Sequence, residues 1–180
     1  MAFAFVVTII CLHYSASRER KIYTAIASAF AIVYCTAVTI VYFTELAVVI
    51  PQLVRHKISD EHLLAFKDGS FMVAVDCIGY AIMSLSTLFA AFAFKNVEGN
   101  RWLYRSLLYN GLLTPVVIAA FFVPAFLVIG ALWMITLPTA MINAAKWFRN
   151  KAKRPQRDVE AEQPNSKPEK IIHYEFHQST

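Results

Sequence analysis

The sequence predicts an all-α protein, a polytopic bundle of about five transmembrane helices with a disordered cytoplasmic C-terminal tail. Two observations carry this prediction. Hydrophobic residues make up 58% of the 180 residues and charged residues only 16%, whereas soluble domains average about 45–50% and about 25%. The charges also cluster in short stretches and in the tail. The runs between them include apolar segments of about 18 or more residues, the length that crosses a bilayer as a helix.

The first two helices are expected near 1–16 and 22–50. The first run, MAFAFVVTIICLHYSA, is slightly short for a span. It has no basic region ahead of it, so an uncleaved helix is favoured, with a cleaved signal peptide as the alternative. The second run is long enough to cross with tilt. Pro51 follows it and is expected to end it, because proline interrupts the helical hydrogen bonds.

The third helix is expected over 71–94, FMVAVDCIGYAIMSLSTLFAAFAF, after the turn-like KDGS. The stretch over 102–148 is too long for one helix at about 1.5 Å rise per residue. A break at Pro124 divides it into helices near 103–122 and 125–148. The break carries no charge, which predicts a tight hairpin at the membrane surface, with a re-entrant pair as the alternative.

These five helices form a predicted transmembrane domain over 1–148, and residues 149–180 form the tail. The tail is basic at first and then of mixed charge, with little apolar content, so it is expected to be disordered. Its first part, KWFRNKAKRPQR, is interpreted as a stop-transfer and orientation signal. Contact between this basic segment and anionic lipid headgroups is the alternative.

The Lys and Arg residues predict the orientation. With an external N-terminus, fourteen of the 17 fall on the cytoplasmic side, in agreement with the excess of positive charge that cytoplasmic loops carry. Trp102 and Trp147 then lie at the inner interface, where indole rings are enriched. The chain is therefore predicted to be a multi-pass protein of the cell membrane with a cytoplasmic C-terminus. Its net charge of +5 is explained by the Lys and Arg beside the helices, so no nucleic-acid partner is predicted.

Two acids fall within the predicted spans. Glu45 lies five residues before the external end of the second helix, and Asp76 five residues after the external start of the third. Both are therefore expected about 7.5 Å from the surface. If they met in a dry setting, repulsion and desolvation would favour a shared proton. The alternative is contact with headgroup water, or pairing with Arg55 or Lys67.

Polar or small residues also recur at helical spacing. Tyr80 follows Asp76 by four residues, and Asn110 follows Ser106 by four. The full stripes are Ala27, Ala31, Tyr34, Val38 and Glu45; Asp76, Tyr80, Ser84 and Thr87; Ser106, Asn110 and Thr114; and Thr136, Ala140 and Asn143. Such stripes predict helix association by close packing and hydrogen bonds. A pathway is the alternative, and its candidate ligand or proton residues are Glu45, Asp76, Tyr80 and Asn110.

Two further features bear on chemistry. Pro115 should free the backbone carbonyl of Gly111, beside Asn110, to bind an ion or water. The loop after Pro51 holds four potential metal ligands without a recognised spacing: His56, Asp60, Glu61 and His62. No catalytic motif, phosphate-binding loop or CxxC pair occurs. No enzyme activity, cofactor or metal site is predicted.

The segments YFTELAVVIP and DCIGYAIMSLSTLFAAFAF resemble a pattern found in small, uncharacterised bacterial multi-spanning membrane proteins. The resemblance implies a membrane helical fold but no activity and no catalytic residues. Two functions remain open. One is binding, transport or sensing of a small solute or proton, with the two acids at the outer mouth. The other is a non-catalytic structural or partner subunit, whose stripes pack against a second copy of the chain or another membrane protein.

Overall fold

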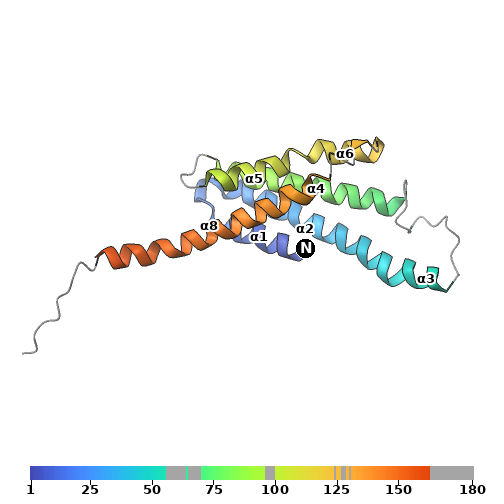
Figure 1. Cartoon of the computed structure of the whole chain (residues 1–180), viewed down its shortest axis with the longest axis horizontal. Helices are drawn as coiled ribbons and strands as arrows, with labels where there is room; N and C mark the ends of the chain where they lie inside the picture. Colours follow the sequence, from blue (N-terminus) through green and yellow to red (C-terminus); the bar gives the residue numbers. More distant parts are fainter. Residues whose placement is uncertain are drawn as a thin grey trace, which may run out of the picture. The chain divides into compact units, whose positions relative to one another are not determined.

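The computed structural model describes residues 1–55, 64, 70–95, 100–123, 125–126, 129 and 131–162. Within these residues the chain is helical and forms no strand, so the all-α prediction is confirmed (Figure 1). The chain divides into two compact units, Met1–Trp147 and Phe148–Thr180. Every side chain of the candidate sites below belongs to the first unit.

The first helical segment is α1 (Ala2–Ser15), as expected. A short 3-10 turn, η1 (Arg18–Arg20), leads into α2 (Lys21–Thr44). The chain then continues as helix through a π-helical turn, η2 (Glu45–Val49), into α3 (Ile50–Val54). The second segment is therefore longer than predicted.

The expectation that Pro51 ends this segment is wrong, because α3 continues to Val54. Proline has no N–H, and its ring clashes with the carbonyl four residues earlier. The chain widens by one π turn directly ahead of it, in which the Ile50 N–H bonds the Glu45 carbonyl. The proline thus changes the helical pitch and does not stop the helix.

Helix α4 (Phe71–Phe94) has the predicted bounds. Its start is fixed by Ser70, whose hydroxyl accepts a hydrogen bond from the Val73 N–H at 3.3 Å. This helix packs against α2, α5 and α6. Its small buried residues permit such close contacts: Gly79, Ala81, Ser84, Ser86, Thr87, Ala90, Ala91 and Ala93.

The predicted fourth helix is two helices, α5 (Arg101–Gly111) and α6 (Thr114–Phe122), separated by a short break. The break lies just ahead of Pro115, which has no N–H to give to the Gly111 carbonyl. The Thr114 hydroxyl donates to that carbonyl at 2.8 Å. The freed carbonyl predicted from the sequence is therefore used within the chain.

The fifth segment, α8 (Trp133–Glu162), begins later and ends later than the predicted 125–148. Its extension shows that the first part of the expected disordered tail is helical. Lys, Arg, Gln and Glu are good helix formers in water, so loss of apolar content does not by itself end a helix. Pro124, the expected hairpin residue, and the rest of the tail, 163–180, lie outside the described residues.

Two of the described helices are long and apolar enough to cross a membrane, Arg18–Val54 and Phe71–Phe94. Helix α1 is apolar but has only 14 residues, about 21 Å of helix against a hydrocarbon core of about 30 Å. The break before Pro115 divides another apolar stretch. Length and composition therefore give a weak indication of a membrane location, with two candidate spans where the sequence predicts five.

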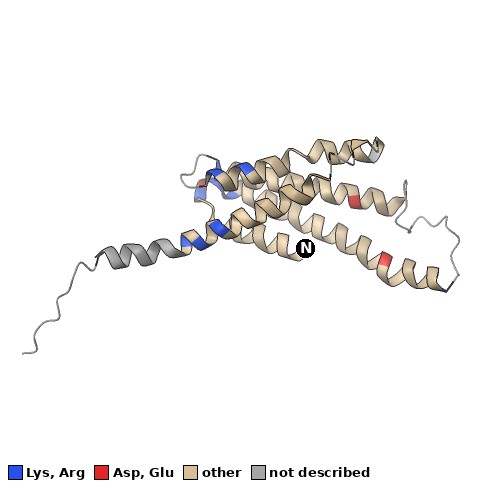
Figure 2. Cartoon of the chain, in the orientation of Figure 1, with Lys and Arg blue, Asp and Glu red and all other residues tan. Residues whose placement is uncertain are grey.

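All described Lys and Arg residues of the first unit except Arg55 gather at one end of it (Figure 2), here called the basic end. It comprises Arg18, Arg20, Lys21, Lys95, Arg101, Arg105 and Lys146. Two contacts bring these segments together. The Arg20 guanidinium donates to the backbone carbonyls of Ala93 and Lys95, and the rings of Phe94 and Trp147 meet edge to face at 5.3 Å. The α1–α2 junction, the end of α4 and α8 thus meet there.

Candidate functional site

Helices α2 and α4 run antiparallel, and their register sets the depth of the two acids. A Cβ atom added to Gly79 would lie 3.4 Å from Val38 Cγ2. Because the helices run antiparallel, Asp76, three residues before Gly79, lies level with Val41, three residues after Val38. Glu45 is four residues farther along α2, about 6 Å farther from the basic end. The two acids are therefore offset by about one turn and do not share one depth, because α2 and its continuation project past the start of α4.

Asp76 lies among tyrosines. Its carboxylate is close enough to the Tyr34 and Tyr80 hydroxyls to interact electrostatically with both, and Tyr42 lies near Tyr80. The Asp76 Oδ1 atom is nevertheless buried without a hydrogen-bond partner among the described residues. A buried carboxylate oxygen left without a donor is costly, so Asp76 has an unused capacity to bind a proton or cation.

Glu45 shares this property, since its Oε2 atom is buried and has no hydrogen-bond partner in the described part of the chain. It opens the π turn η2, and π turns are frequent at functional sites. Neither acid forms an ion pair with Arg55 within the described residues, and Lys67 lies outside them. The offset leaves the acids as two separate positions.

A row of aromatic rings crosses the first unit close to Asp76. Phe5 on α1 meets Tyr34 edge to face at 5.5 Å, Tyr34 meets Tyr80 at 5.9 Å, and Tyr80 stacks on Trp133 at 4.5 Å and 27°. The row connects α1, α2, α4 and α8, and the aromatic faces carry negative electrostatic potential. Tyr80, a residue singled out from the sequence, lies at its centre.

Asn110 lies in a different environment. Its side chain is fully buried, its Nδ2 donates to Thr87 Oγ1 at 3.0 Å, and its Oδ1 accepts from Thr136 Oγ1 at 2.8 Å. Thr87 in turn donates to the Ser84 carbonyl. The amide thus joins α4, α5 and α8, and both its oxygen and its nitrogen take part in bonds between helices. This arrangement is that of a structural cross-link.

Other polar side chains between helices are also hydrogen-bonded. The Ser86 hydroxyl donates to the Ala27 carbonyl of α2 at 2.7 Å. Thr24 donates to the Lys21 carbonyl, and its oxygen lies 3.0 Å from His13 Nδ1. The predicted packing of the second-helix stripe is confirmed by the buried Ala27, Ala31, Tyr34 and Val38.

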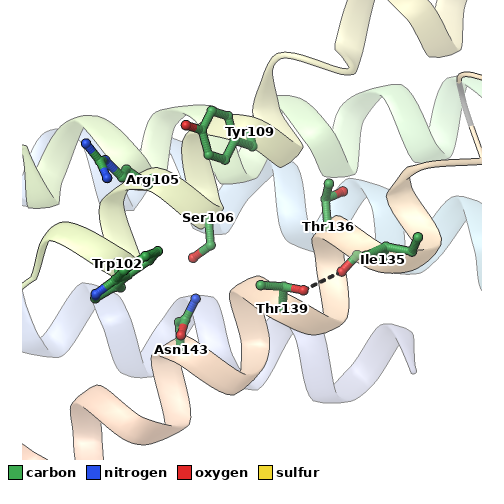
Figure 3. Close-up of a pocket in the computed structure, with 8 residues that line it drawn as sticks. All are labelled: Trp102, Arg105, Ser106, Tyr109, Ile135, Thr136, Thr139 and Asn143. Carbon is green, nitrogen blue, oxygen red and sulfur yellow. Dashed lines mark hydrogen bonds between the residues drawn. The ribbon is translucent and has the colours of Figure 1, made fainter.

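A groove of about 180 Å³ lies between α5 and α8 (Figure 3). Its lining residues are Trp102, Arg105, Ser106, Tyr109, Ile135, Thr136, Thr139 and Asn143. Arg105 has no hydrogen-bond or ion-pair partner among the described residues, and no acid lines the groove. No local sequence pattern brings Arg105 together with Asn143, because the two lie 38 residues apart.

The potential metal ligands His56, Asp60, Glu61 and His62 lie outside the described residues. Within the described part, no group of three or more His, Cys, Asp or Glu side chains is placed to hold a metal ion. No family model, curated protein or solved structure matches the chain. The resemblance to small bacterial membrane proteins therefore stays a prediction.

Proposed function

We propose that the protein is a multi-pass membrane helix bundle that binds a proton or a small cation at Asp76. The observation that carries the proposal is the buried Asp76 Oδ1, which has no hydrogen-bond partner among the described residues although Tyr34 and Tyr80 lie near the carboxylate. A carboxylate inside a membrane protein is costly and marks a binding or proton-transfer position by default. Asn110 and Glu45 are not part of this site.

The membrane placement has two supports. Two helices have the length and composition of spans, and α2 exposes large apolar side chains such as Ile32, Ile40 and Phe43, as lipid contact would require. The gathering of Lys and Arg at the basic end (Figure 2) supports a cytoplasmic basic end and an external N-terminus. Asp76 then lies in the outer half of the bilayer.

The surroundings of Asp76 suit a positively charged species. Tyr34 lies near it on α2, and Tyr80 and Cys77 lie near it on α4. None of these groups carries positive charge that would compete for the carboxylate. The faces of Tyr80 and Trp133 add negative potential, which attracts cations. A proton would neutralise the acid in place, whereas a small organic cation would pair with it against the rings.

The proposal is tested with Asp76→Asn, which keeps the shape of the side chain and removes its charge. Infrared difference spectra of the purified protein across a pH step should contain a carboxylic-acid carbonyl band in the wild type and lack it in the variant. Tetramethylammonium chloride serves as the cation probe, with thermal stabilisation as its measurement. The matched control is Glu19→Gln, because Glu19 is an exposed acid at the other end of the bundle. Equal proton and cation responses in wild type and Asp76→Asn would exclude the site.

A second candidate is a structural or partner subunit. It is favoured by the Asn110 cross-link and the Ser86–Ala27 bond, which engage interior polar groups in helix association. This candidate predicts a stable oligomer or a bound membrane partner in mild detergent, and no change on Asp76→Asn beyond stability. A monomer that responds to protons or tetramethylammonium through Asp76 would contradict it.

A further inference from the structure

We propose that the groove between α5 and α8 binds the phosphate headgroup of an anionic phospholipid from the cytoplasmic leaflet. This inference rests on the membrane placement proposed above and is independent of Asp76, which belongs to another part of the first unit. It concerns different residues from the basic tail. The groove combines a free cation, further hydrogen-bond donors and an exposed indole.

The donors lie on both walls of the groove. Arg105 and Trp102 extend from α5, and the Asn143 side chain extends from α8 towards the Ser106 side of α5 (Figure 3). Arg105, Asn143 and Trp102 have no hydrogen-bond partner within the described residues, so their N–H groups are available. Arg binds phosphate through two parallel charge-assisted hydrogen bonds. Trp102 is 73% exposed, and an exposed indole at this level suits the headgroup region.

The serine and threonine hydroxyls of the groove are already used as donors. Ser106 donates to the Leu103 carbonyl, Thr136 to Asn110, and Thr139 to the Ile135 carbonyl. The polar end that can receive a phosphate is therefore the one formed by Arg105, Asn143 and Trp102, close to the basic end. Among the described lining residues a lipid headgroup there would meet one positive charge and no acid, which favours an anionic lipid over a zwitterionic one.

The remainder of the groove suits an acyl chain. Tyr109 and Ile135 are 59% and 67% exposed, and both line the groove. Tyr109 is seven residues beyond Trp102 on α5, about 10 Å along the helix. A chain attached to a phosphate at Arg105 would lie along these side chains. Free phosphate would use only the polar end, so the lipid is distinguished from it by the contribution of the apolar part.

The test measures binding of phosphatidylglycerol to the delipidated full-length protein in detergent, by native mass spectrometry and by thermal stabilisation. Phosphatidylcholine and soluble glycerol phosphate are the comparison ligands. We expect phosphatidylglycerol to bind at least several-fold more tightly than either. Arg105→Gln should weaken it about tenfold, the loss expected for a charge-assisted hydrogen bond. Arg18→Gln, which removes an exposed arginine of the basic end outside the groove, should leave the affinity unchanged.

Several results would overturn the inference. Equal binding of phosphatidylcholine would remove the role of charge, and equal stabilisation by glycerol phosphate would point to a soluble anion. A loss in Arg18→Gln as large as in Arg105→Gln would show general attraction to the basic end. If Arg105→Gln fails to fold, Asn143→Leu is tested instead. Full phosphatidylglycerol affinity in that variant would also exclude the groove.

Discussion

The two halves of α4 differ in how their polar groups are satisfied. In the half nearer the basic end, 84–94, Ser86 and Thr87 bond or receive bonds from α2 and α5, and small residues allow the helices to approach. In the half farther away, 71–83, Asp76 has a buried oxygen without a partner and Tyr80 takes part in a row of rings. The first half holds the bundle together. The second half contains a buried carboxylate oxygen that can still accept a proton or a cation.

This difference teaches how structural and functional polar residues can be told apart in a membrane bundle. Helices in lipid associate through close packing and interhelical hydrogen bonds, because burial of apolar surface gives little drive. Polar groups that serve association therefore have partners inside the chain. A buried carboxylate oxygen without one, as in Asp76, costs far more than an unpaired hydroxyl such as that of Ser84, and it points to a ligand or a proton. The predictions below test the first half of the comparison by removing its contacts.

The largest effect is expected for Gly111→Ala. An added Cβ would lie 2.6 Å from Leu88 Cβ and 2.7 Å from Leu88 Cα, so α5 would have to move away from the α4 backbone. We expect a loss of about 2–3 kcal/mol in the free energy of unfolding, measured by denaturant or thermal unfolding in detergent. Gly79→Ala is the control, since its added Cβ meets Val38 at an ordinary 3.4 Å. It should change stability by less than about 1 kcal/mol. Equal losses in the two variants would contradict the comparison.

The next effect is expected for Asn110→Ala. The change removes both bonds between helices and leaves the Thr136 hydroxyl without its acceptor. The free energy of unfolding should fall by about 1–2 kcal/mol. Thr139→Ala removes a hydroxyl that bonds only its own helix and should cost clearly less. If Asn110→Ala left the free energy of unfolding unchanged, the buried amide would not join the three helices. Asn110 would then again be a candidate ligand-binding residue.

The smallest effect is expected for Ser86→Ala. Its hydroxyl makes one bond to the Ala27 carbonyl, so the loss should be about 0.5–1 kcal/mol. Ser84→Ala provides a matched comparison one half-turn away. The Ser84 hydroxyl is buried without a partner among the described residues, so its removal should be neutral or slightly stabilising. A greater loss for Ser84→Ala than for Ser86→Ala would show that a ligand or water uses the Ser84 hydroxyl.

Some of this arrangement could be predicted from residue order alone. The bounds of α4 follow from its apolar run and its Ser70 cap, and the inward face of α2 follows from the spacing of Ala27, Ala31, Tyr34 and Val38. Whether each proline stops its helix does not follow from the sequence. Proline disrupts one backbone bond, but whether the helix stops depends on what else can satisfy or avoid that bond. A π turn maintains the helix at Pro51, whereas Thr114 satisfies the carbonyl beside a break at Pro115.

The sequence by itself determined the helical class, the end at which positive charge gathers, and Asp76 as an acid within an apolar run, because composition and periodicity are properties of the chain. Only the tertiary structure decided what each polar residue does. It gave Asn110 two partners from other helices, offset Glu45 from Asp76, and placed Arg105 and Asn143 in one groove. The physical reason is that hydrogen bonds and charge contacts extend only a few ångströms. Their formation therefore depends on helix register and on break points, and no single segment encodes either.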